Sequence, residues 1–232
     1  MKLYVGTSGY SYKEWKGHFY PKELSEKEFL KFYGTKLNAV EINNTFYRLP
    51  KESVMQAWVE QVPEDFAFSI KASQRITHIK RLKDAGDETE YLLRVARTLK
   101  RRLGVVLFQL PPNMKKDIER LGSFLKLLAG DVRVAIEFRH PSWFDDETYA
   151  LLQANDCSMC IADWDEKLDV PFVSTANWGY LRLRRENYTS ADLKKWMKKI
   201  QSQDWQTAFV FFKHEDEGVG PKLAMKFLQM VE

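Results

Sequence analysis

Eight short apolar runs recur along the chain, and polar or charged residues follow nearly every one of them. The runs lie at residues 2–6, 38–42, 66–71, 104–110, 132–138, 157–163, 178–183 and 207–212. Amphipathic stretches with a helical period separate most of them, at residues 25–36, 51–62, 88–102, 114–129, 145–155, 189–202 and 219–232. A strand followed by a helix, repeated nearly eight times, predicts a parallel sheet.

Helix-capping pairs and a proline mark the ends of some of these segments. Ser25 with Glu28, and Thr189 with Asp192, form pairs that are typical of helix starts. The segment 163–177 has no helical period and contains Pro171, so we predict a long loop there.

Alternation within the runs separates a closed barrel from an open sheet. Alternate residues of each run form two sets, or parities, that point to opposite faces of a strand. One set consists mostly of small residues followed by polar ones: Ala39, Glu41 and Asn43; Ala67, Ser69 and Lys71; Ala135, Glu137 and Arg139; Met159, Ile161 and Asp163. Small residues suit a crowded barrel interior that opens into a mouth, whereas a doubly wound open sheet is apolar on both faces. We therefore predict an α/β TIM-type (β/α)8-like barrel that occupies residues 1–232 as a single domain.

Composition narrows the classes of protein. With 44% hydrophobic and 29% charged residues the chain is not intrinsically disordered, and a net charge of +4 does not by itself argue for nucleic acid. The longest apolar runs fall far short of the roughly 20 residues that span a bilayer, so we expect no membrane partner and a cytoplasmic location. The oligomeric state stays open.

Two sequence motifs carry no cofactor chemistry. Cys157 and Cys160 read C-x-x-C, but residues three apart on a strand point to opposite faces and cannot share a disulfide or a metal. The first loop reads GTSGYSY and lacks the G-x-G-x-x-G fingerprint of dinucleotide binding.

The carboxyl ends of the predicted strands gather polar side chains at one mouth, where barrel enzymes place their sites. By parity these are Glu41, Asn43, Lys71, Gln109, Glu137, Arg139, Asp163 and Arg182, with Lys213 as a further candidate. The bases outnumber the acids, so a carboxylate or phosphate ligand would balance the surplus. The alternative is a closed salt-bridge network that only rigidifies this end of the barrel.

Chemical roles follow from residue type. Glu41 and Glu137 are candidates for proton transfer, and His140, within EFRHPSW, could assist as a general acid or base. Lys71 could clamp an anion, pair with Glu41 or form a Schiff base, and we favour the clamp or the pair. Lys71, Glu41, Glu137 and Asp163 are expected to share one cavity.

Aromatic residues and metal ligands leave alternatives open. Tyr10, Trp15 and Trp143 in mouth loops could stack on a sugar ring or base, or could pack small cores of their own. Metal ligands could come from Glu41, Glu137, Asp163, His140 and His214, yet no ligand-spacing signature is present. We therefore assign no metal residues and leave the cofactor open.

Five segments resemble one known family, the YecE-like proteins called domain of unknown function 72. They are GTSGYSYKEWKGHFYP, VEINNTFYRLP, FSIKASQRITHIKRL, GVVLFQLPP and VAIEFRHPSW. The resemblance implies a TIM-barrel-like fold and brings no catalytic assignment, because the family's activity is not established. Members commonly show R-L-H-G and F-N-N-D stretches where this chain has RLRRENY and FFKHEDEG.

Three functions are compatible with these patterns. The leading hypothesis is an enzyme that uses acid–base or electrostatic catalysis on a small anionic or sugar-like substrate. The first alternative is a nucleic-acid-processing or nucleic-acid-binding protein, for which residues 80–83 supply a basic run. The second is a non-catalytic protein that binds a small molecule.

Overall fold

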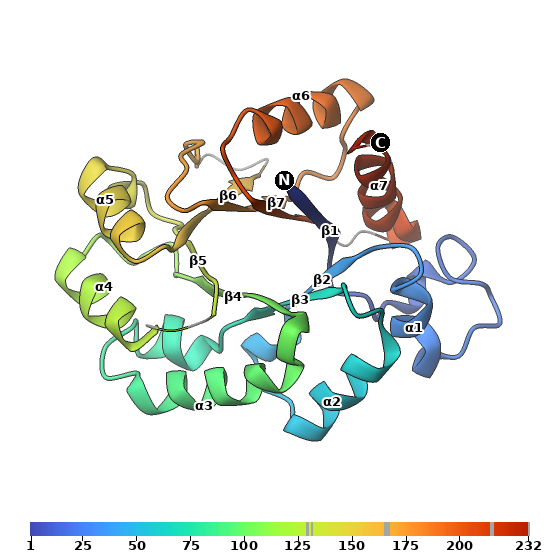
Figure 1. The fold of residues 1–232 in the computed structure, drawn as a ribbon, viewed down its shortest axis with the longest axis horizontal. Coiled ribbons are helices and arrows are strands. Elements are labelled where there is room, and N and C mark those ends of the chain that lie inside the picture. The colour runs from blue at the N-terminus through green and yellow to red at the C-terminus, as the bar shows by residue number, and fades with distance from the viewer. Residues whose placement is uncertain (129, 131, 165–167, 214–215, 232) are drawn as a thin grey trace.

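Eight parallel strands close into a barrel in the order of the chain, and β8 pairs with β1 (Figure 1). The computed structural model describes residues 1–128, 130, 132–164, 168–213 and 216–231. The strands are β1 (Lys2–Ser8), β2 (Ala39–Ile42), β3 (Ala67–Lys71), β4 (Leu103–Gln109), β5 (Val134–Glu137), β6 (Ser158–Asp163), β7 (Trp178–Leu183) and β8 (Thr207–Phe212). All eight predicted strands and the barrel are confirmed.

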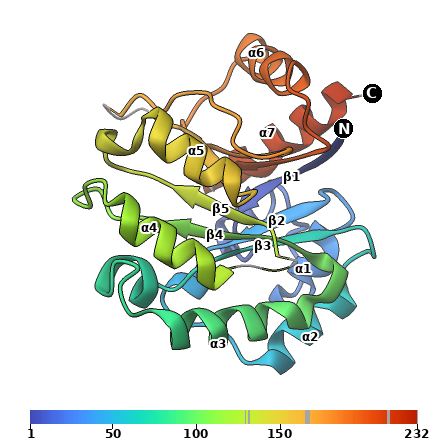
Figure 2. The same ribbon diagram turned by 60° about the vertical axis from the view of Figure 1, so that its left-hand side comes forward.

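Helices surround the barrel on its outside (Figures 1 and 2). They are α1 (Phe29–Tyr33), α2 (Glu52–Gln61), α3 (Gly86–Ala96), α4 (Ile118–Leu125), α5 (Asp146–Ala154), α6 (Ser190–Gln201) and α7 (Val219–Leu228). The described residues of the segment 163–177 contain no helix after β6, as predicted. No helix in the described ranges is long and apolar enough to cross a membrane.

Helix starts follow their capping residues. The predicted capping box of Thr189 and Asp192 opens α6 and is confirmed. α4 begins later than predicted, because Asp117 accepts the backbone N–H of Arg120 and places the helix start there. Ser25 caps a short 3₁₀ turn instead of the predicted box, because its Oγ accepts the backbone N–H of Lys27 at 3.4 Å while the N–H of Glu28 donates to the Ser25 carbonyl.

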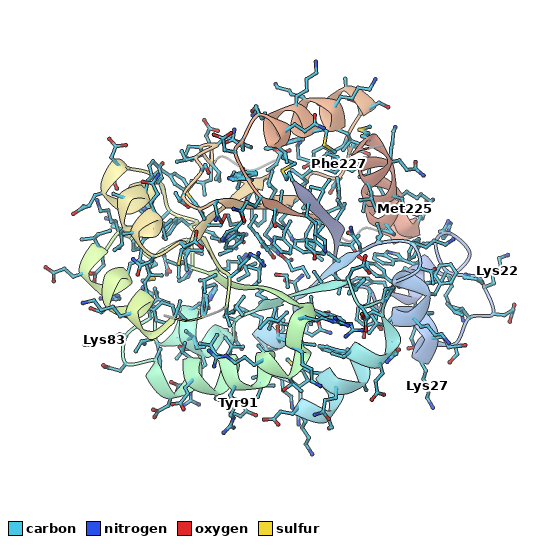
Figure 3. All side chains as sticks on the ribbon, in the orientation of Figure 1. Lys22, Lys27, Lys83, Tyr91, Met225 and Phe227 are labelled. Atoms are coloured by element: carbon cyan, nitrogen blue, oxygen red, sulfur yellow. The ribbon has the colours of Figure 1, made fainter. Side chains whose placement is uncertain are left out.

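Two layers of buried side chains form the core. Side chains inside the barrel, such as Ala39, Ala67 and Ala135, are separate from a larger cluster between the strands and the helices. Figure 3 shows side chains filling the space within the strands, while Lys22, Lys83 and others lie on the outer rim. Small residues therefore face inward on β2, β3 and β5, as their parity predicts.

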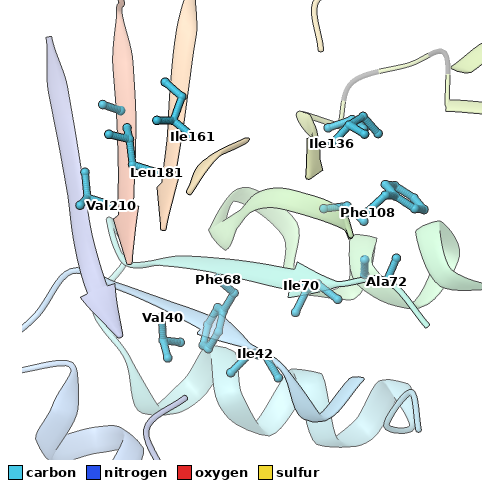
Figure 4. Close-up of a cluster of buried hydrophobic side chains, with 14 of the residues drawn as sticks. Val40, Ile42, Phe68, Ile70, Ala72, Phe108, Ile136, Ile161, Leu181 and Val210 are labelled. Carbon is cyan, nitrogen blue, oxygen red and sulfur yellow. The ribbon is translucent and has the colours of Figure 1, made fainter. Parts of the chain in front are cut away.

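Strand β6 has the opposite parity to the one predicted. Cys160 and Ala162 face the barrel interior, whereas Met159 and Ile161 pack in the outer cluster, where Figure 4 shows Ile161. Both parities of this strand are apolar, so its sequence does not specify the register, and a shift of one residue turns every side chain to the other face. The outward position of Asp163 follows directly.

Candidate functional site

Arg182 joins two carboxylates inside the mouth of the barrel. Its Nη2 lies 2.8 Å from Glu41 Oε1 and its Nη1 lies 2.6 Å from Glu137 Oε2. The Arg182 side chain is only 2% exposed, and both carboxylates are buried. Because β2, β5 and β7 each contribute one of these residues, the ion pairs connect distant parts of the barrel wall.

Glu41 accepts hydrogen bonds at both of its carboxylate oxygens. Oε1 accepts from Ser8 Oγ at 2.8 Å and Asn43 Nδ2 at 3.1 Å, in addition to Arg182. Oε2 accepts from Tyr180 Oη at 2.7 Å. Four donors match the capacity of an ionised carboxylate, which has about four acceptor positions.

A tight turn at Gly9 brings Ser8 to this carboxylate. Gly9 has a φ of +99°, which favours glycine, and its N–H donates to the backbone carbonyl of Glu41 at 2.8 Å. The end of β1 is thereby fastened to β2 beside Glu41.

Glu137 is held from two sides. Gln109 Nε2 lies 2.9 Å from Oε1 and 3.0 Å from Oε2, so the amide of β4 spans the carboxylate. Arg139 Nε lies 3.5 Å from Oε1. The parallel register places Gln109 level with Glu137, which explains why the two side chains meet.

Both carboxylates stay ionised despite their burial. Burial raises the pKa of Glu41, but the charges of Arg182 and Arg184 and the hydrogen bonds from Arg182 and Tyr180 outweigh it and bring that pKa to about 2. Burial likewise raises the pKa of Glu137, and the charges of Arg182 and Arg139 lower it below its usual range. Each is a fixed negative charge at neutral pH.

Lys71 stands apart from this network. Its Nζ lies 4.3 Å from the centre of the Phe46 ring, and among the described residues no carboxylate pairs with it. Burial lowers the pKa of Lys71 to about 8, and the Arg182 charge adds to that effect against the opposing charges of Glu137 and Glu41. The expected pair of Lys71 with Glu41 does not form, because Arg182, Tyr180, Ser8 and Asn43 already occupy the oxygens of Glu41.

Two further arginines meet at Trp164. The Arg139 guanidinium lies 4.4 Å and that of Arg184 lies 5.2 Å from the ring centre of Trp164. Arg184 Nη1 also donates to Ser8 Oγ at 3.1 Å. Burial, then the Arg182 charge, lowers the pKa of Arg184 to about 10, so it remains a cation at neutral pH. Its Nε is buried without a hydrogen-bond partner among the described residues, as is that of Arg182.

Positive charge exceeds negative charge in the described part of the mouth. Two carboxylates, Glu41 and Glu137, face four bases, namely Lys71, Arg139, Arg182 and Arg184. The predicted excess of bases over acids is therefore present, although one of these bases, Arg184, was not among the predicted site residues. These described groups therefore carry a net positive charge.

Asp163 does not belong to the mouth, and its predicted place in the shared cavity is wrong. Its Oδ2 accepts from Arg185 Nε at 2.9 Å, Tyr188 Oη at 2.8 Å and Trp196 Nε1 at 3.2 Å, which lie outside the strands. The inverted parity of β6 is the physical reason. Asp163 instead fastens the loop after β7 to α6.

Two of the aromatic residues predicted to bind substrate are core residues. Trp15 is 1% exposed and packs against Tyr12, Phe19 and Tyr20. Trp143 is fully buried, stacks on Phe138 and donates its Nε1–H to the Met114 carbonyl at 2.8 Å. Neither ring has a free face for a ligand, so the long loops pack small cores of their own.

Tyr10 has a different setting, because it lines a cavity beside the mouth. The cavity measures about 160 Å³ and lies between the ends of β1 and β2. Its wall includes Tyr12, Trp58 and Arg48, and it shares Asn43 with the carboxylate network. It offers aromatic and amide surface next to the charged groups.

His140 is not connected to the network by any contact in the described structure. Its Nδ1 lies 2.8 Å from Ser142 Oγ and accepts the backbone N–H of Ser142 at 3.2 Å, so it caps the turn at Pro141–Trp143. Its catalytic role stays a prediction. Lys213 follows β8 and bonds through its backbone to Leu183, and His214 lies outside the described residues.

Three residues of the network were not among the predicted site residues: Tyr180, Ser69 and Arg184. Trp178, Tyr180, Arg182 and Arg184 share one parity, so the choice of Arg182 already implied its neighbours. Tyr180 Oη lies 2.6 Å from Ser69 Oγ, which links β7 to β3 beneath the carboxylates.

Metal ligands do not gather in the described part of the chain, where no three His, Cys, Asp or Glu side chains are grouped to hold an ion. Arginine, tyrosine and amide donors occupy the oxygens of Glu41 and Glu137. Cys157 and Cys160 are buried free thiols on opposite sides of the sheet, as expected.

Two known proteins are similar to this chain in sequence. UPF0759 protein YunF of Bacillus subtilis is 26% identical over 93% of this chain and 79% of its own length. UPF0759 protein YecE of Escherichia coli K12 is 33% identical over 61% of this chain, a match that spans half of the YecE length.

Solved structures agree on the fold. A DUF72 family protein of Thermotoga maritima superimposes with a TM-score of 0.87 at 28% identity, over 100% of this chain and 99% of that one. One from Enterococcus faecalis gives 0.84 at 19% identity, over 99% and 95% of the two chains. The family model described as "Protein of unknown function DUF72" matches residues 4–232. The chain therefore belongs to the DUF72 family.

Proposed function

We propose that this protein is an enzyme that binds a small anionic substrate at the mouth of the barrel and acts on it by electrostatic and acid–base catalysis. The surplus of positive charge supports this proposal, because two carboxylates face four buried or partly buried bases. Unpaired charge in a protein interior is costly, and a bound anion removes that cost. Lys71, Arg139 and Arg184 are the cations that would hold it.

The two carboxylates hold the site in position in this proposal. Glu41 and Glu137 are fully engaged by donors and have lowered pKa values, which suits fixed charges better than groups that exchange protons near neutral pH. Lys71, with a pKa of about 8, is better matched to proton transfer. We therefore assign proton transfer to Lys71 and the orientation of Arg182 to Glu41 and Glu137.

The cavity beside Tyr10 extends the proposal to a second part of the substrate. Tyr10 and Trp58 supply aromatic surface, and Asn43 and Asn44 supply amide groups. Sugar-like rings bind to this combination of stacking and hydrogen bonding. A substrate with an anionic group and a neutral ring or polyol would occupy both parts of the mouth.

Thermal-shift titration with phosphate, sulfate and oxalate tests anion binding. We expect the melting temperature to rise with at least one of them, since a ligand that binds only the folded state stabilises it. Arg184→Gln should abolish the rise. Arg94→Gln on the exposed face of α3 is the matched control and should keep it. If none of the three anions raises the melting temperature, the proposal is wrong.

A nucleic-acid role ranks lower because the basic run after β3 is partly neutralised. Arg75 and Lys80 both pair with Glu88, at 2.9 and 2.7 Å. We expect weak oligonucleotide binding in fluorescence anisotropy. Sub-micromolar binding that falls steeply with salt, and is lost in Lys80→Glu/Arg81→Glu, would promote this alternative, because each phosphate contact contributes about 0.9 to the logarithmic salt slope.

We further propose a cytoplasmic location. Its support is that both cysteines are free thiols, as is usual in a reducing compartment. Fractionation of cells with an antibody against the chain tests it.

A further inference from the structure

Lys71 occupies a defined position above the carboxylate network. It is the last residue of β3, and the parallel register sets Glu41 level with Ser69. Side chains two residues apart on a strand share a face, so Lys71 follows Ser69 toward the mouth. The amine therefore lies at the opening of the barrel.

No described acid neutralises the amine, although two carboxylates influence it. Arg182 and its hydrogen-bonding neighbours engage Glu41 and Glu137, while Lys71 Nζ contacts the Phe46 ring at 4.3 Å. The charged groups around it come from β2, β5, β7 and the turn after β3: Glu41, Glu137, Arg139, Arg182, Arg184 and His78. Burial and the like charges of Arg182 and Arg184 favour the neutral amine, and together they outweigh the opposing charges of Glu137 and Glu41.

We propose that Lys71 forms an imine with an aldehyde or ketone that also carries a carboxylate or phosphate group. This inference rests on the proposed function, because the anionic group of the same molecule would bind Arg139 and Arg184. It makes Lys71 a nucleophile in place of the proton transfer assigned above. Such a ligand matches both features of the mouth, a nucleophilic amine and two guanidinium groups whose charge the carboxylates do not fully neutralise. The lowered pKa of Lys71 supports the assignment, since only the unprotonated amine attacks a carbonyl carbon.

The reaction needs no oxidant, reductant or metal. The lone pair of Lys71 Nζ forms a bond to the carbonyl carbon, and the carbonyl π electrons move to its oxygen. The resulting carbinolamine loses that oxygen as water, which carries both protons of the neutral amine, and a C=N bond remains. Hydrolysis reverses each step and regenerates the free lysine.

Reductive trapping on the whole protein tests the proposal. Glyoxylate and cyanoborohydride are added at pH 7, and the modified lysines are located by peptide mass mapping. At pH 7 an amine with a pKa of about 8 is roughly one-tenth unprotonated, whereas an amine with the ordinary lysine pKa of about 10.4 is unprotonated in less than about one molecule in a thousand. We expect Lys71 to be labelled at least about tenfold faster than Lys2, which also lies beside a ring, 4.7 Å from Tyr4, but on the exposed opposite end of the barrel.

Two variants and one comparison within the unmodified protein test the carbonyl reaction and the anion binding separately. Lys71→Arg should lose the label at position 71 while keeping the positive charge. Arg184→Gln should slow labelling by glyoxylate about tenfold more than labelling by the uncharged aldehyde formaldehyde, a difference of about 1.4 kcal/mol, because only glyoxylate carries a carboxylate and both reactions share the rise in the Lys71 pKa that follows loss of this charge. Equal labelling of Lys71 and Lys2 in the unmodified protein would overturn the proposal without any variant.

The outcomes also separate this inference from the proposed function. If oxalate raises the melting temperature but Lys71 is labelled no faster than Lys2, the imine is ruled out and the anion site stands. If Lys71 is labelled rapidly by both aldehydes and Arg184→Gln slows labelling by glyoxylate no more than labelling by formaldehyde, the anionic substrate class is wrong. If no anion binds and Lys71 is unreactive, both proposals fall.

Discussion

Arg182 Nη2 lies 2.8 Å from Glu41 Oε1, although 141 residues separate the two in the chain. The contact joins β7 to β2 across the interior of the barrel, and the second branch of the same guanidinium reaches Glu137 on β5. A buried charge with two partners on opposite walls is strongly oriented. Lys71 and Arg184, by contrast, have no carboxylate partner among the described residues.

Removing the bridging guanidinium should destabilise the protein strongly. Arg182→Met leaves two carboxylates buried without their main partner, and breaking such a pair costs about 3–5 kcal/mol. The pKa values of Glu41 and Glu137 then rise, so the variant should recover part of this loss on acidification as the carboxylates are protonated. Urea unfolding at pH 7 and pH 5 measures both effects.

Arg94→Met is the control, and as a surface substitution it should change the free energy of unfolding by less than about 0.5 kcal/mol. A small loss for Arg182→Met that does not vary with pH would contradict the assigned network.

Acid should weaken the native protein through Glu41. Its pKa falls from 4.5 to about 2 on folding, so its stabilising contribution is complete above pH 4.5 and is lost as the pH falls toward 2. Glu137 contributes in the same direction. The Glu41 contribution amounts to about 3 kcal/mol.

Glu41→Gln cannot ionise and should therefore unfold with a flatter pH dependence below pH 4.5. The two curves of unfolding free energy should converge in acid. Glu26→Gln, which changes an exposed pair with Lys13, is the control and should parallel the unmodified protein. Parallel curves for Glu41→Gln would show that the carboxylate is not held ionised by its neighbours.

Lys71 should reduce stability at neutral pH. Its pKa is lowered to about 8, so burial penalises the protonated form, and the penalty is relieved as the pH rises from 8 to 10.5. Lys71→Met keeps a side chain against Phe46 and removes the charge. It should stabilise the protein by about 1–2 kcal/mol at pH 7, after allowance for solvent screening, and by less at pH 10.

Lys2→Met, at the exposed end of the barrel, is the matched control and should leave stability unchanged within about 0.5 kcal/mol. A destabilised Lys71→Met at pH 7 would mean that the ammonium makes net favourable interactions, and Lys71 would then be a structural residue.

The strands could be predicted because each run is apolar and bounded by polar residues, and β2, β3 and β5 have distinct small and bulky parities. The register of β6 could not be predicted, because the residues on both of its faces are apolar: Met159, Cys160, Ile161 and Ala162. Only contacts with β5 and β7 decide which face looks inward. The misplacement of Asp163 follows from that ambiguity.

The sequence predicts the net charge of the site better than it predicts which of its residues pair with each other. Glu41, Gln109, Glu137, Arg139 and Arg182 follow from strand parity. That Arg182 rather than Lys71 pairs with Glu41 depends on distances across the barrel, which a linear sequence does not contain. The burial of Trp15 and Trp143 likewise depends on how the long loops fold over themselves.

The position at which a small oxyanion binds decides whether the basic mouth of the barrel is an anion site. Crystals soaked in selenate, a tetrahedral dianion whose selenium scatters anomalously, would reveal where such an ion binds. We predict a selenium peak among Lys71, Arg139 and Arg184, displaced by excess phosphate and missing in Arg184→Gln crystals that retain the Glu41–Arg182 contact. Selenium peaks confined to the outer surface, with an empty mouth in the unmodified protein, would contradict it.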